Sequence, residues 1–229
     1  MTHALVWAAA GTGFTFLMTA LGAATVLFFR KAAGPGLQRI CLGFAAGVMI
    51  AASVWSLLIP AMEEAEAVGT PGWLPAPGGF VLGAGFLLLL DHLLPHLHLN
   101  AAEPEGPRTA WQRTTLLVLA VTLHNIPEGM AVGLSFALAA QHSGDPALLS
   151  AAWALALGIG IQNFPEGAAI SLPLRQAGLR RFPAFVRGAL SGLVEPVFGV
   201  LVVLAAGGVR PVMPWLLAFA AGAMVYVVV

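Results

Sequence analysis

Residues 124–129 read His-Asn-Ile-Pro-Glu-Gly, and residues 162–167, further along the chain, read Gln-Asn-Phe-Pro-Glu-Gly. Both motifs stand inside segments that are too apolar for a water-facing surface. Each motif therefore puts a carboxylate, an amide and a proline where hydrocarbon is expected. An ionisable side chain in such a place marks a functional site by default. We take this pair of motifs as the feature around which the chain is organised.

The composition is that of an integral membrane protein. Hydrophobic residues make up 59% and charged residues 9% of the 229 residues, whereas soluble domains carry about 25% charged residues. Ten basic and ten acidic residues balance to zero net charge, and the sequence has no basic run, which argues against a nucleic-acid partner. Because Cys41 is the single cysteine, an internal disulfide and a cysteine-based zinc site are excluded.

Seven apolar segments are long enough to cross a membrane, since about 20 residues span a hydrocarbon core of about 30 Å. The predicted spans cover residues 5–29, 37–60, 79–99, 111–140, 148–173, 184–206 and 212–229. The expected fold is an all-α, polytopic helix bundle that forms one transmembrane domain over residues 1–229. All basic residues except Arg210 then fall on one side, and the positive-inside rule places the N-terminus outside the cytoplasm.

The first motif has the geometry of a shared ligand. Helical winding places Glu128 about 40° from His124 and about 60° from Asn125 around the helix axis, that is, between the two. The second motif repeats this arrangement with Gln162, Asn163 and Glu166. Two such helices face to face would form a cage of nitrogen and oxygen ligands with bridging carboxylates.

The chemistry of these side chains favours a divalent cation. Pro127 and Pro165 each remove a helical hydrogen bond, so each helix is predicted to be broken and to expose a carbonyl. Imidazole together with carboxylates suits Zn, Fe, Ni, Mn or Co, whereas an alkali or calcium site would not require His124. Glu195, beside Pro196, is a third carboxylate at a depth without Lys or Arg. Its counter-charge must come from bound cations or from protonation.

Polar side chains outside the motifs have an ordinary and a functional interpretation. Met49 in the second span is either a gap-filling side chain or a soft thioether ligand. Asp91 and His92, near the inner end of the third span, are either a water-satisfied helix end or an exit ligand or proton acceptor. His96 and His98 lie in a proline-broken segment, and two histidines are few for a metal-binding tract.

An acidic segment follows the second span. Its carboxylates, Glu63, Glu64 and Glu66, form either a solvated helix end before a turn-rich linker or a weak cation-attracting mouth.

A second internal similarity flanks the paired motifs. Residues 44–49 read Phe-Ala-Ala-Gly-Val-Met, and residues 219–224 read Phe-Ala-Ala-Gly-Ala-Met. Inverted repeats around a central site are typical of transporters. If spans one to three form one repeat, the other repeat is one helix short, and the sequence stops inside an apolar run. We therefore expect that an eighth span is missing from this chain.

At these motifs the sequence resembles the ZIP (Zrt/Irt-like protein) family of divalent metal transporters, close to its bacterial members, over essentially the whole chain. Spans four and five match the family's His-Asn-x-Pro-Glu-Gly and Gln-Asn-x-Pro-Glu-Gly. The resemblance implies a binuclear intramembrane site. It assigns to the primary site His124, Glu128, Gln162, Glu166 and Met49, and to the second site Asn125, Glu128, Asn163, Glu166 and Glu195.

The resemblance also implies how such a protein works. Family members have eight core helices in a three-two-three arrangement with both termini outside, and this type lies in the bacterial inner membrane. They move zinc, and related ions such as Cd, Fe or Mn, toward the cytoplasm by an elevator-like movement of the helices that carry the site. Many are dimers, so the expected partners are metal ions, the lipid bilayer and a second copy of the chain.

Two rival functions fit parts of the pattern. A His and a Glu at positions i and i+4 are similar to the helix face of an intramembrane zinc-dependent hydrolase, but that chemistry needs two His on one helix and an open coordination position. A non-transporting metal sensor needs an output domain, which this chain lacks room for. Interhelical polar contacts alone would not require a duplicated amide-proline-carboxylate motif. No enzymatic activity is expected.

Overall fold

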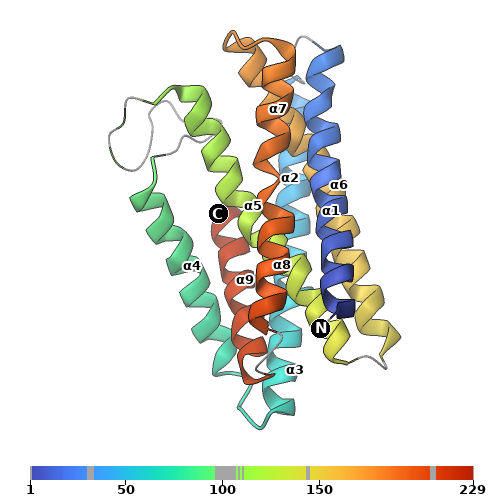
Figure 1. Ribbon diagram of the computed structural model, residues 1–229. Helices are drawn as coiled ribbons and strands as arrows, with labels where there is room; N and C mark the ends of the chain where they lie inside the picture. The colour runs from blue at the N-terminus through green and yellow to red at the C-terminus, as the bar shows by residue number, and fades with distance from the viewer. Residues whose placement is uncertain are drawn as a thin grey trace.

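The computed structural model describes residues 2–29, 34–95, 107, 109, 111–142, 145–206 and 210–228, and nearly all of them are helical. In chain order the elements are α1 (Thr2–Phe28), α2 (Pro35–Ala51), the π-helix η1 (Ala52–Leu58), α3 (Ile59–Ala67), α4 (Pro75–Leu93), α5 (Arg113–Gln141), α6 (Pro146–Gln176), α7 (Arg181–Ser191), α8 (Val194–Ala206), the 3-10 turn η2 (Arg210–Val212) and α9 (Met213–Val228). They form an elongated bundle (Figure 1).

Six helical stretches are long and apolar enough to cross a membrane. They correspond to the first six predicted spans, and the seventh predicted span is the shorter apolar helix α9. The prediction of an all-α, multi-pass membrane protein is therefore confirmed. The second and third spans differ most from their predicted bounds, because the second continues through α3 to Ala67 and the third is helix α4, which begins at Pro75 and ends at Leu93. The acidic residues Glu63, Glu64 and Glu66 thus lie at a helix end, as one of their two interpretations from the sequence expects.

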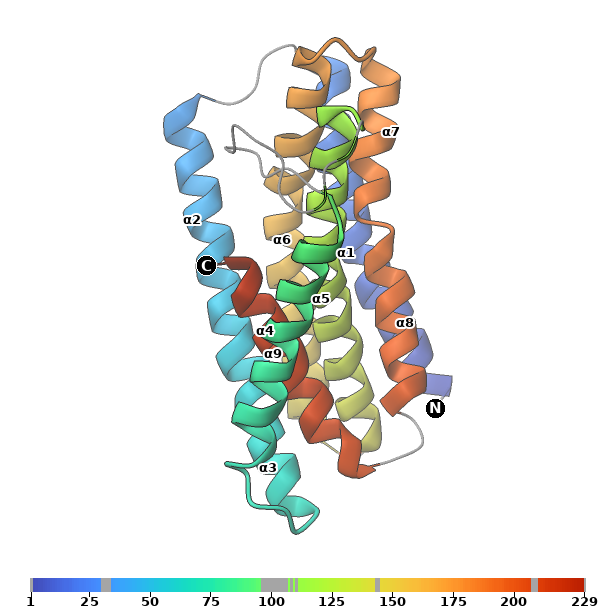
Figure 2. The same ribbon diagram turned by 90° about the vertical axis from the view of Figure 1, so that its left-hand side faces the viewer.

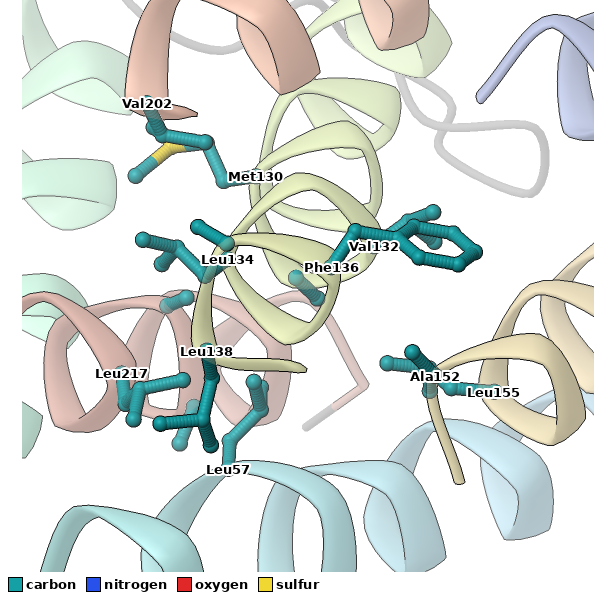
Figure 3. Close-up of a cluster of buried hydrophobic side chains, with 14 of the residues drawn as sticks. Leu57, Met130, Val132, Leu134, Phe136, Leu138, Ala152, Leu155, Val202 and Leu217 are labelled. Atoms are coloured by element: carbon teal, nitrogen blue, oxygen red, sulfur yellow. The ribbon is translucent and has the colours of Figure 1, made fainter. Parts of the chain in front are cut away.

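Helix α5 is the centre of the bundle (Figure 2). In its most apolar stretch 72% of the residues are buried, against 22% to 39% in the other five spans. It packs against α1, α6, α8 and α9. Figure 3 shows the apolar side chains of its C-terminal half and those that surround them from the second span, α6, α8 and α9, among them Leu57, Ala152, Leu155, Val202 and Leu217.

The helix pairings agree with the predicted inverted repeats. Helix α1 packs along α6, and α8 packs along α5. In the predicted repeat, α1 corresponds to α7 and α8, and α5 corresponds to α6. The contact between α1 and α6 then corresponds to the contact between α8 and α5. In the same repeat the second span corresponds to α9, and these two helices carry the repeated Phe-Ala-Ala-Gly sequence.

The prolines of the two motifs do not end their helices. Helices α5 and α6 continue through Pro127 and Pro165, because proline has a helical φ and costs one backbone hydrogen bond that a membrane helix tolerates. The interruptions of the spans lie elsewhere. One is the π-helix η1 in the second span, and the other is the turn at Gly192 and Leu193 that separates α7 from α8.

The charged helix ends are distributed unevenly. The starts of α2, α5 and α7 and the end of α6 lie at one end of the bundle (Figure 1), and these segments carry Arg39, Arg113, Arg175, Arg180 and Arg181. The opposite end contains the acidic helix α3 and the start of η2 at Arg210.

Glycines allow α4 and α9 to touch at the backbone. A Cβ atom added to Gly222 of α9 would overlap the carbonyl group of Phe80, and one added to Gly83 of α4 would overlap that of Phe219. Gly47 occupies the same position in the repeated sequence of α2, yet it has open space around its Cα. Two identical sequence positions therefore have opposite packing environments.

We expect Gly222→Ala to lower the apparent melting temperature of the purified protein in detergent, because overpacking typically costs about 1–3 kcal/mol. Gly47→Ala is the matched control and should leave the melting temperature unchanged or slightly higher, since alanine is the better helix former. Thermal unfolding monitored by circular dichroism measures both. Equal losses in the two variants would contradict the backbone contact between α4 and α9.

Candidate metal site

The predicted ligand residues lie about midway along their spans. Helix α5 carries His124, Asn125 and Glu128, α6 carries Gln162, Asn163 and Glu166, the first turn of α8 carries Glu195, and α2 carries Met49. Helices α5 and α6 pack against each other, and α1 packs against both of them and against α8. The fold therefore brings the two motifs and Glu195 into one region.

A hydrogen bond joins the two motifs directly. The Gln162 side-chain amide donates from Nε2 to Glu128 Oε1 over 2.6 Å. Both side chains are fully buried. This contact shows that the carboxylate of the first motif faces the second motif, as the helix geometry predicts.

Glu195 is held by groups from two other helices. Its Oε2 accepts a hydrogen bond of 2.9 Å from Asn163 Nδ2 on α6, and its Oε1 accepts one of 3.3 Å from the Thr19 hydroxyl on α1. All three side chains are buried. The third carboxylate thus belongs to the same polar cluster as the second motif.

The remaining residues of the first motif are anchored to backbone carbonyls. Asn125 Nδ2 donates to the Ser191 carbonyl oxygen at the end of α7 over 3.0 Å. His124 Nδ1 lies 2.7 Å from the Ala120 carbonyl oxygen, and because a carbonyl only accepts, Nδ1 must carry the proton. A neutral imidazole in this tautomer has its lone pair on Nε2, which is the usual arrangement of a metal-ligating histidine.

Four buried oxygen atoms of the two motifs have no hydrogen-bond partner within the described part of the chain. They are Asn125 Oδ1, Glu128 Oε2, Gln162 Oε1 and Asn163 Oδ1. In each of the three amide side chains the nitrogen donates a hydrogen bond within the protein. The oxygen of the same amide accepts none from the described residues. An unsatisfied buried polar group costs about 1–3 kcal/mol, and all four atoms are acceptors. Bound cations can satisfy such acceptors.

Amide oxygens are needed to complete a ligand set. Within the ranges that the structure describes, no three His, Cys, Asp or Glu side chains are close enough to hold an ion by themselves. His124 and Glu166 are half-buried, in contrast to the fully enclosed Asn125, Glu128 and Asn163. The arrangement therefore combines buried oxygen donors with an imidazole and a carboxylate that are partly accessible.

Met49 lies in the apolar core, where 7% of its surface is exposed. It lies next to η1 on α2, and this helix contacts α6 near Gly158, where a Cβ atom would lie 3.5 Å from a methyl group of Val48. Ligation by Met49 remains a prediction.

The predicted auxiliary residues lie apart from the motifs, at the C-terminal end of α4. Asp91 Oδ2 accepts a hydrogen bond of 2.7 Å from the Tyr226 hydroxyl on α9, so it links two helices. His92 is exposed, with Nδ1 2.8 Å from the Leu88 carbonyl oxygen. His96 and His98 lie outside the described residues.

Helix α1 contributes side chains to this cluster that were not among the predicted site residues. Thr12, Thr15 and Thr19 are all fully buried, and Thr19 reaches Glu195. Their spacing of three and four residues puts them on one helix face, which was the signal available in the sequence. The backbone carbonyl of Ser191 accepts a hydrogen bond from the Asn125 side chain, and no comparable pattern in the sequence indicated this contact.

Comparison with known proteins agrees with the motifs. The family model described as ZIP zinc transporter matches residues 105–229, more than half of the chain. Zinc transporter ZIP11 of Homo sapiens is 40% identical, over 95% of this chain and 86% of that protein. Zinc transporter GufA of Myxococcus xanthus is 42% identical, over 92% of this chain and 80% of that protein. Zinc transporter ZIPB of Bordetella bronchiseptica is 40% identical, over 99% of this chain and 70% of that protein. These relatives are named transport proteins, not enzymes. The chain belongs to the ZIP zinc transporter family.

Proposed function

We propose that this protein moves divalent transition-metal ions, with zinc as the main substrate, across the membrane toward the cytoplasm. The observation that carries the proposal is the group of four buried oxygens from the two motifs that have no hydrogen-bond partner among the described residues. Buried acceptors without donors are costly unless a cation binds them, and imidazole and carboxylate ligands beside them suit zinc. The names of the similar proteins, all zinc transporters, support the same substrate.

The ions would occupy two neighbouring sites that share carboxylates. The first ion would be held by His124, Glu128, Gln162 and Glu166, with Met49 from the second span, and the second ion by Asn125, Glu128, Asn163, Glu166 and Glu195. Two features support this division. Glu128 lies between His124 and Asn125 around its helix, and Asn163 contacts Glu195 whereas Gln162 contacts Glu128.

The uneven distribution of arginines supports an orientation. By the positive-inside rule, the end of the bundle that carries Arg39, Arg113 and the α6–α7 arginines would face the cytoplasm. The protein would lie in a bacterial inner membrane. Its N-terminus and the acidic helix α3 would then be on the outer side of that membrane. Metal ions would enter from the acidic end and leave at the basic end.

The proposal is tested by metal uptake into proteoliposomes. A competition series over Zn, Cd, Fe, Mn and Ni, with and without a pH gradient, gives the substrate range and the coupling ion. Saturable uptake of zinc that cadmium inhibits is expected. Vesicles that contain the protein but accumulate no more of any of these ions than empty vesicles would overturn the proposal.

We further propose that the helices move as two groups during transport. The site group is α1, α5, α6, α7 and α8, and the frame group is α2, η1, α3, α4 and α9. The hydrogen bonds described above between the motifs, Glu195, Ser191 and Thr19 all stay within the site group. The core between α5 and the frame group is apolar, and apolar surfaces slide without breaking polar contacts.

A contact between His142 and Glu64 joins the site group to the frame group. His142 Nε2 at the end of α5 lies 2.7 Å from Glu64 Oε1 on α3. His142 is exposed, so the pair is accessible to reagents. A covalent link at this point would hold the two groups in a fixed relative position.

We expect that linking cysteines at positions 64 and 142 stops transport while metal binding persists. Glu64→Cys and His142→Cys would be combined with Cys41→Ala, and a short, reducible bifunctional thiol reagent would join them. Zinc uptake should fall to the background of empty vesicles and return on reduction, and each single-cysteine variant serves as the control. Full uptake by the linked protein would show that the two groups do not move apart here.

A further inference from the structure

Three buried threonines form one face of α1 against the site-bearing helices. Thr12, Thr15 and Thr19 are fully buried, and α1 packs against α5, α6, α7 and α8. The Thr12 hydroxyl donates to the Ala8 carbonyl oxygen of its own helix over 2.6 Å, and the Thr15 hydroxyl to that of Thr12 over 3.0 Å. Such bonds within a helix are the ordinary way in which a buried threonine is satisfied.

Thr19 differs from Thr12 because its hydroxyl reaches another helix, where Thr19 and Thr15 both interact with Glu195. Its hydroxyl lies 3.3 Å from the Thr15 carbonyl oxygen and also 3.3 Å from Glu195 Oε1. A hydroxyl has one proton to donate, and an ionised carboxylate is the stronger acceptor of the two. The Thr19 hydroxyl is therefore directed to Glu195 whenever this carboxylate is charged.

The backbone around Thr19 leaves its side chain little freedom. A Cβ atom on Gly192, in the turn before α8, would lie 3.0 Å from Thr19 Cβ and 3.1 Å from Glu195 Oε1. A Cβ atom on Gly167 of α6 would overlap the carbonyl oxygen of Thr19. A glycine on α6 and a glycine in the turn before α8 thus allow the close approach that brings the hydroxyl to the carboxylate.

The inverted repeat gives Thr19 and Glu195 corresponding positions. The glycine that ends the first motif, Gly129, packs on the backbone of Glu195, and the glycine that ends the second motif, Gly167, packs on the backbone of Thr19. Because α5 corresponds to α6 and α8 to α1, residue 19 is the counterpart of residue 195. Two corresponding side chains therefore meet at the same polar cluster, one as a carboxylate and the other as a hydroxyl.

We propose that Thr19 is a positioning residue for the second metal ion, which it serves by holding the carboxylate of Glu195. The proposal rests on the binuclear site of the proposed function. Thr19 donates to Oε1 and Asn163 to Oε2, and Thr15 is a further hydrogen-bond partner of this carboxylate. A carboxylate has about four lone-pair directions, so at least one remains for an ion. Without the Thr19 hydroxyl, Glu195 Oε1 loses a donor in a buried place and the carboxylate is held less firmly.

The test compares four forms of the full-length protein by calorimetric titration with Zn²⁺ in detergent. Thr19→Val removes the hydroxyl and preserves the shape of the side chain, and Thr19→Ser retains the hydroxyl. Thr12→Val is the matched control, because Thr12 is equally buried on the same face but bonds its own helix. Loss of an outer partner of a ligand typically weakens metal binding about 10- to 100-fold, and we expect this change in one of the two ions for Thr19→Val alone.

The outcomes separate this inference from the binuclear site itself. Wild-type protein that binds one ion would contradict the binuclear site, and the inference with it, before any variant is compared. Wild-type protein that binds two ions, with both affinities retained in Thr19→Val, would overturn the role of Thr19 alone. If Thr19→Val and Thr12→Val weaken zinc binding equally, Thr19 acts through packing and not through its hydrogen bond to Glu195. If Thr19→Val does not fold, Thr19→Ala and Thr12→Ala replace the pair.

Discussion

Glu128→Ala is expected to weaken the binding of both metal ions together, by about 100-fold or more, because a lost ligand costs at least as much as a lost outer partner. Glu128 is buried between the two motifs, where Oε1 accepts from Gln162 and Oε2 has no hydrogen-bond partner among the residues that the structure describes. In the proposed binuclear site, a carboxylate in that position would offer one oxygen to each ion. Calorimetric titration with zinc would show the loss of both binding steps.

Two controls make this expectation specific. Asn125→Ala should weaken only one step, because Asn125 belongs to one of the two proposed ligand sets. Glu63→Ala removes an exposed carboxylate on α3 and should change neither step. If Glu128→Ala retains one step at its original affinity, Glu128 does not bridge two ions.

His124 and Gln162 are expected to have unequal effects on metal choice, although they occupy the same position in their motifs. An imidazole binds zinc much better than a neutral amide oxygen does, whereas manganese accepts all-oxygen coordination. His124→Gln should therefore lose about tenfold or more affinity for zinc and clearly less for manganese. Such a tenfold change corresponds to about 1.4 kcal/mol.

The reciprocal variant tests the same idea in the other direction. Gln162→His should bind zinc or cadmium more tightly and transport it more slowly, because release must break a stronger bond. Initial uptake rates and binding constants for zinc and manganese, measured in both variants, give the comparison. If His124→Gln loses the same affinity for both ions, His124 acts on the helix or on protons and does not select the metal.

The sequence predicted the features that depend on local composition. Apolar runs of span length fix the number and order of the helices, and polar motifs inside them stand out because hydrocarbon excludes such groups. The angular positions of the motif residues predicted a cage between the two helices, and the contact of Gln162 with Glu128 agrees with this. The helix bounds were less certain where apolar and polar stretches merge, as at the second span, which continues to Ala67.

Features that depend on contacts between distant segments were not predictable in this way. Thr19 is ordinary in its own helix, and only the packing of α1 on α8 brings it to Glu195. The anchoring of Asn125 by the Ser191 carbonyl depends on where α7 ends. The site of the helix interruptions was also unexpected, because the prolines suggested breaks in α5 and α6 while the chain is interrupted at η1 and at Gly192.

The central claim is that metal ions cross the membrane through the cluster formed by α5, α6 and α8. The most direct test is the uptake of radioactive zinc into proteoliposomes that contain equal amounts of wild-type protein, Glu128→Ala and the control Glu63→Ala. We predict saturable uptake by the wild type and by Glu63→Ala, and uptake by Glu128→Ala no greater than that of empty vesicles. Uptake by Glu128→Ala at the wild-type rate would contradict the claim.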